Sequence, residues 1–166
     1  MAQETGTPVW WHERASFSNG RFGPYEPCVM VFFNGQVIAG SSTSGNLYTL
    51  DLTTFTDNGA IRKWLRSWRA HPQASAKAIS YRVLEIDMET GVTPAGSNPQ
   101  LVLRYSDDAH NWSHERFGSA GPTGEYDWRI RFRRLGMERR GLSSDRIFEL
   151  SSTDPFKVAL MGADVS

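Results

Sequence analysis

Short apolar segments that end at tight-turn residues are the feature that most constrains the fold of this 166-residue chain. Residues 29–33 form an apolar, β-rich run that stops at Asn34-Gly35, a dipeptide strongly favoured in two-residue β-hairpins. Residues 36–39 are the predicted return strand, and residues 47–52 alternate with the period of two that is typical of a half-buried strand. Further strands are predicted at residues 78–88, 100–105, 128–134, 146–152 and 157–161.

One segment, residues 61–70, fits two kinds of structure. Its apolar residues at positions 61, 64, 65 and 68 match a helical period as well as a strand. We favour a strand, because the neighbouring segments are all predicted strands. Residues 89–99 and 135–145 contain glycine together with proline or charged residues, and we predict that both are loops.

A short motif that occurs twice predicts how the strands are organised. The pattern Trp-x-His-Glu-Arg is found at residues 10–14 and again at residues 112–116, and a glycine-containing turn follows each copy. This spacing is about twice the length of a four-stranded propeller blade. We therefore predict an all-β, antiparallel fold with β-propeller-like blades, an incomplete propeller of about two and a half blades.

The predicted organisation is a single β domain over residues 1–166. Residues 1–9 are an N-terminal extension, residues 10–59 a first blade, residues 60–120 a second blade and residues 121–166 a partial third blade. Closed propellers need about four blades or more. An incomplete one exposes edge strands, which invite pairing with another chain, so we expect this protein to work with partners.

The turn at residues 106–112 resembles an Asp box, the hairpin turn that decorates many propellers. It is one residue shorter than the pattern Ser-x-Asp-x-Gly-x-Thr-Trp and lacks the glycine of that pattern. The aspartate of such a turn accepts backbone N–H bonds, and the tryptophan ring packs over it. We predict that Ser106, Asp108 and Trp112 are structural; a catalytic or calcium-binding role for Asp108 is the alternative.

Two predicted strands each align three side chains of one charge on one face, because side chains alternate along a strand. The acidic stripe is Glu85, Asp87 and Glu89, and the arginine stripe is Arg129, Arg131 and Arg133. Arginine is suited to bidentate pairing with carboxylates. We predict that the stripes meet, on neighbouring strands or across a subunit interface. The alternatives are two solvated faces, or a cation site at Glu85 and Asp87.

Composition and missing motifs exclude several functions. The 18 basic and 18 acidic residues balance, whereas proteins that neutralise DNA phosphates carry a basic excess. Cys28 is the single cysteine and cannot form an internal disulfide. We find no nucleophile–base set, phosphate loop or metal-ligand motif, and so predict no enzymatic activity, metal or cofactor. Without a secretion signal or a run long enough to span a bilayer, the chain is expected to be made in the host cytoplasm, with no membrane partner.

Six segments, in their order along the chain, point to one family. They lie at residues 11–16, 45–51, 84–91, 103–108, 133–137 and 145–150. Together they resemble the packaged-DNA stabilisation proteins of short-tailed bacteriophages, mainly the C-terminal part of those proteins, over about residues 10–162. The resemblance implies a structural protein of the tail hub, or nozzle, that forms a ring below the portal, extends the DNA channel and helps to retain the packaged genome.

We therefore predict a non-enzymatic component of a phage tail or portal-vertex assembly, located in the virion. The partners implied are other tail and portal-vertex proteins and further copies in a homo-oligomeric ring, with packaged DNA passing through the channel without specific binding. One alternative is a glycan-binding or glycan-processing Asp-box module. The other is a propeller fragment from a decayed prophage that has no function.

Overall fold

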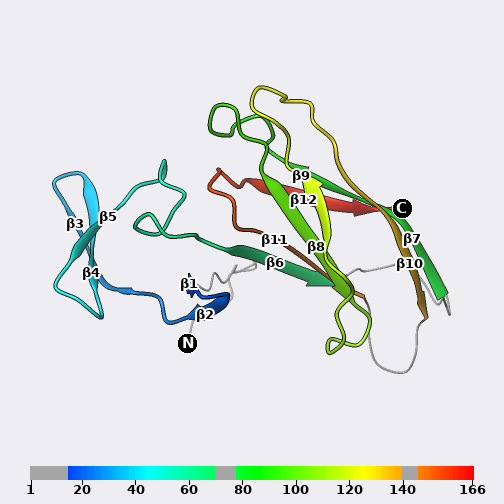
Figure 1. The fold of residues 1–166 in the computed structure, drawn as a ribbon, viewed down its shortest axis with the longest axis horizontal. Coiled ribbons are helices and arrows are strands. Elements are labelled where there is room, and N and C mark those ends of the chain that lie inside the picture. The colour runs from blue at the N-terminus through cyan, green and yellow to red at the C-terminus, as the bar shows by residue number, and fades with distance from the viewer. Residues whose placement is uncertain (1–14, 70–77, 140–145) are drawn as a thin grey trace, which may run out of the picture. The chain divides into compact units, whose positions relative to one another are not determined.

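The computed structural model describes residues 15–69, 78–139 and 146–166 (Figure 1). All regular structure in these residues is β-strand, and every pair of strands is antiparallel. The predicted all-β, antiparallel fold class is therefore confirmed. The first copy of the repeated motif, at residues 10–14, lies outside the described residues. None of the described residues forms a helix that could cross a membrane.

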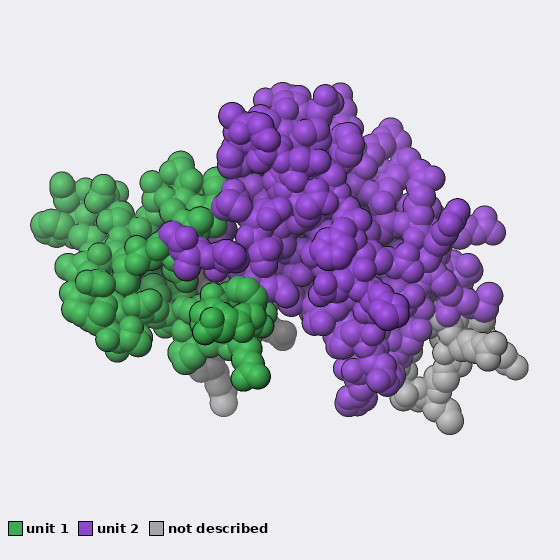
Figure 2. All heavy atoms as spheres, viewed as in Figure 1, with its two compact units in different colours: residues 1–58 green, residues 59–166 purple. Residues whose placement is uncertain are grey.

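The chain divides into two compact units, residues 1–58 and residues 59–166 (Figure 2). Unit 1 contains the hairpin of β1 (Ser16–Ser18) and β2 (Arg21–Gly23), and a second sheet in the order β3-β4-β5. Unit 2 contains all later strands. The division lies beside the predicted boundary between the first two blades. The assignment of one domain made of blades stays a prediction.

Asparagine–glycine turns set the hairpins of unit 1. The turn between β3 (Pro27–Phe33) and β4 (Gln36–Ser41) passes through Asn34 and Gly35, whose φ angles are 48° and 77°. Two successive positive φ angles define the type I′ turn, whose twist matches that of the paired strands. The hairpin predicted at this dipeptide is confirmed. Strand β5 (Leu47–Leu50) pairs with β4 and completes the sheet.

Unit 2 is built from two antiparallel sheets. One has the order β10-β7-β12, and the other has the order β6-β11-β8-β9. The strands of the first sheet are β7 (Ala78–Met88), β10 (Ile130–Arg139) and β12 (Leu160–Val165). Those of the second are β6 (Trp64–Arg69), β8 (Gln100–Ser106), β9 (Arg116–Ser119) and β11 (Ile147–Ser152). Within the ambiguous segment at residues 61–70, residues 64–69 form the predicted strand, residues 61–63 do not, and residue 70 lies outside the described residues.

Side chains from both sheets form the core of unit 2. The core-facing residues of β7 alternate as expected, with Leu84, Ile86 and Met88 buried. Phe148 of β11 is fully buried, and its ring lies 5.6 Å from that of Tyr81 on β7, edge to face. The remaining buried core residues are Leu101, Leu103, Ala120, Ile130, Phe132, Leu135, Leu150 and Phe156. Burial between two sheets of alternating strands is the arrangement of a β-sandwich.

The propeller-like detail of the prediction is not confirmed. A blade is a sheet of strands that follow one another along the chain, whereas β7 pairs with β10 and β12, and β8 pairs with β9 and β11. The loop at residues 89–99 joins β7 and β8, which belong to different sheets. Strand propensity is local, but the choice of pairing partner depends on long-range burial, so the sequence pattern located strands better than sheets.

The loop predicted at residues 135–145 is wrong over its first part, because β10 continues to Arg139. A β-bulge interrupts the pairing with β7 between Arg133 and Gly136. Arg134 and Gly136 both have positive φ, 58° and 84°. Glycine inside a strand marks such bulges, so the glycine that favoured a loop in the sequence instead marks a kink within a strand.

Candidate functional site

The acidic and arginine stripes lie on neighbouring strands of the β10-β7-β12 sheet. Arg131 is directly opposite Glu85, and its Nε and Nη2 lie 2.8 and 3.4 Å from the two carboxylate oxygens. This is the bidentate geometry for which arginine is suited. The hydrogen bond from Arg131 is the main cause that lowers the pKa of Glu85; partial burial opposes it, and the charges of Arg131 and Arg129 add to it.

The other stripe residues are engaged differently. Glu89 forms a salt bridge with Lys157, at 2.6 Å between Oε2 and Nζ. Asp87, Arg129 and Arg133 are exposed and form no salt bridge with another described residue. The structure therefore brings the two stripes together at one pair and leaves three charged side chains exposed.

Charge changes sign across this sheet. Arg131 and Arg133 lie on β10 at one edge, directly after Arg129, and Glu85 and Asp87 lie on β7 in the centre, directly before Glu89. On β12, the other edge strand, exposed Asp164 is paired in register with Glu85. No group of three or more His, Cys, Asp or Glu side chains in the described part of the chain is placed to hold a metal ion. The face consequently has a basic edge and an acidic edge, with Glu85 already bound by Arg131.

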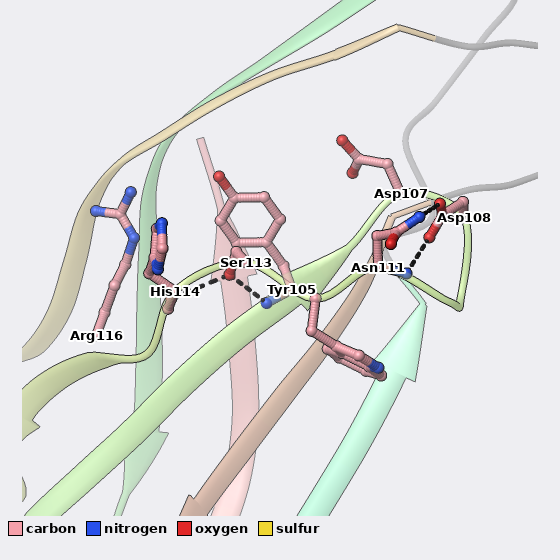
Figure 3. A pocket seen from close by; sticks show the side chains of 8 residues that line it. Tyr105, Asp107, Asp108, Asn111, Ser113, His114 and Arg116 are labelled. Atoms are coloured by element: carbon pink, nitrogen blue, oxygen red, sulfur yellow. Dashed lines mark hydrogen bonds between the residues drawn. The ribbon is translucent and has the colours of Figure 1, made fainter.

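The turn at residues 106–112 is organised around Asp108 (Figure 3). Its Oδ1 accepts hydrogen bonds from the backbone N–H groups of His110 (2.9 Å) and Asn111 (2.6 Å), and from the Ser106 hydroxyl (3.0 Å). Its Oδ2 accepts one from the Asn111 side-chain amide at 2.6 Å. Hydrogen bonds from Asn111, backbone and then side chain, followed by that from His110, hold the pKa of Asp108 far below its usual range. The carboxylate is thus engaged by the turn itself.

Trp112 at the end of this turn is half-buried, and an arginine side chain lies over the face of its ring. The guanidinium carbon of Arg104 lies 4.5 Å from the ring centroid, a cation–π geometry. Arg104 also forms a 2.5 Å salt bridge with Glu149, which is buried in the centre of the sheet. Trp112, Arg104 and Glu149 therefore form a chain of contacts on the face of β8 and β11 that points away from the core.

No sequence motif pointed to Arg146, the most deeply buried charged side chain among the described residues. Only 1% of its surface is exposed, and its Nε and Nη2 lie 2.5 and 2.8 Å from the carboxylate oxygens of Asp107. Its Nη1 donates to the carbonyl oxygen of Leu135, and its guanidinium carbon lies 4.7 and 4.1 Å from the rings of Tyr81 and Tyr105. These partners come from both sheets, so the side chain of Arg146 connects the two sheets through a salt bridge, a hydrogen bond and two ring contacts.

An open pocket of about 530 Å³ lies beside the turn, lined by both aspartates and by Tyr105, Asn111, Trp112, Ser113, His114 and Arg116 (Figure 3). Catalysis by a carboxylate pair needs one acid and one base that are free to exchange protons with a substrate. Here Asp107 is bound to Arg146 and Asp108 accepts the bonds of the turn. Both carboxylates therefore have structural partners within the protein.

The comparisons with known proteins agree with the two-sheet architecture. Residues 63–166 match a family model described as "Bacteriophage P22 Gp10, beta-sandwich". The match covers more than half of the chain, lies within unit 2 and includes both charged stripes and the turn. A comparison with curated proteins finds no match. The sequence resemblance to a phage family is confirmed by this match.

Proposed function

Because the chain belongs to the bacteriophage P22 Gp10 β-sandwich family, and so to the structural proteins of phage tails, we propose that it is a component of the tail hub or nozzle. In this role it extends the DNA channel below the portal and helps to retain the packaged genome. It acts without catalysis, through contacts with other tail and portal-vertex proteins in the virion. The match over residues 63–166 is the observation that carries this proposal.

The sandwich of unit 2 suits a mechanical role. Its core is closed by two sheets and by the buried Arg146, which contacts residues of both. Close-packed interiors of this kind deform little. The unit thus supports a rigid block whose outer faces make the contacts of an assembly.

The charged face offers a way to join copies in a ring. Arg129 and Arg133 near β10 are exposed, and Asp164 on β12 is exposed at the opposite edge. When β10 of one copy faces β12 of the next, opposite charges meet. Such a head-to-tail contact closes into a ring when the rotation allows it. Complementary charge of this kind favours correct docking and suppresses wrong partners.

Packaged DNA is proposed to pass through the channel without specific binding. The 18 basic residues are balanced by 18 acidic ones, and the central arginine of the stripe is neutralised by Glu85. A surface of this kind neither gains much from counterion release nor holds DNA tightly. Weak interaction is compatible with a channel that must later let the genome leave.

The test is to purify phage particles made with and without this gene product. We expect the chain in wild-type particles at a fixed ratio to the portal protein, measured by quantitative mass spectrometry. Particles that lack it should package DNA and then lose it, measured as DNase-resistant genomes over time. Absence of the chain from purified particles, or full genome retention without it, would contradict the proposal.

A further inference from the structure

We draw no further inference here: the strongest candidate, the apolar surface patch along the edge strand β3 of unit 1, carries no proposal because nothing in the structure shows what covers it.

Discussion

The two units use similar strands and bury them differently. In unit 2, each sheet covers the apolar face of the other, and residues such as Leu84, Leu103 and Phe148 are fully buried. In unit 1, the described β3-β4-β5 sheet buries Ala39 but leaves the apolar residues of β3 exposed. A single sheet has no second layer to cover its faces. The difference teaches that β-rich apolar sequence specifies a strand but does not specify the layer that covers its faces.

The largest difference between the two units is expected when one phenylalanine in each unit is replaced by alanine. Phe148→Ala removes a fully buried ring that packs against Trp68, Tyr81 and Tyr105, and should lower the free energy of unfolding by about 3–5 kcal/mol. Phe32→Ala removes a ring that is 73% exposed and should change the stability of the isolated chain by less than about 0.5 kcal/mol. Urea unfolding of both variants checks this. Equal losses would show that β3 is part of a closed core.

The second substitution tests the salt bridge between Asp107 and the buried Arg146, which connects the two sheets of unit 2. Asp107→Ala leaves the guanidinium of Arg146 buried without its carboxylate, and should cost about 3 kcal/mol. The double variant Asp107→Ala with Arg146→Met replaces the pair by an apolar side chain and should recover part of that loss. Thermal melting measures both. An unchanged melting temperature in Asp107→Ala would show that Arg146 does not depend on this partner.

A smaller effect is expected at the turns, where both units hold an aspartate by hydrogen bonds. The pKa of Asp108 is lowered in the folded protein, so its stabilising contribution is present above the usual aspartate pKa of about 3.9 and is lost as the pH falls through the folded value. Asp108→Asn should therefore lower the melting temperature more at pH 7 than at pH 3.

The matched control for this pH dependence is Asp51→Asn in unit 1. Hydrogen bonds from the Thr53 backbone and then its side chain lower the pKa of Asp51. Because its turn is remote in sequence from the sandwich strands, the unit 2 transition, followed by hydrogen exchange of the β8 and β11 amides, should keep its wild-type pH dependence. If Asp108→Asn behaves like this control, the turn does not stabilise the sandwich.

The smallest effect on folding is expected on the charged face. Glu85→Gln removes an exposed bidentate pair with Arg131, and exposed pairs are screened by water and salt. We expect a nearly unchanged melting temperature together with weaker, more salt-sensitive ring assembly, measured by native mass spectrometry. Glu89→Gln, which breaks the exposed pair with Lys157, is the control. If neither variant changes ring assembly, the stripes are solvated faces that make no contact between copies.

Much of the fold could be predicted from local pattern. The period of two placed Leu84, Ile86 and Met88 inward and Glu85 and Asp87 outward, and the structure agrees. The same period aligned Glu85 and Arg131 within their stripes, but their position opposite each other depends on the pairing of β7 with β10. The alternation along each strand is local, so the sequence alone was sufficient to predict it.

The features that escaped prediction depend on long-range contacts. The pairing of β7 with β10 and β12 joins segments far apart in the chain, and no local signal specifies it. Arg146 did carry a signal, because the period of two puts it on the same side of β11 as Phe148 and Leu150, which are core residues. A charge on a core-facing position predicts a buried ion pair, but its partner, Asp107, lies 39 residues away in sequence.

Hydrogen exchange of the intact chain tests most directly the central claim that the two sheets of unit 2 cover each other while the β3-β4-β5 sheet leaves the apolar side chains of β3 exposed. We predict that amides of β8 and β11, which lie inside a sheet of the sandwich, are strongly protected, whereas amides of the edge strand β3 exchange faster. The contrary result is protection of the β3 amides that equals the protection of β8 and β11. In that case the chain itself covers this edge, and the difference between the two units disappears.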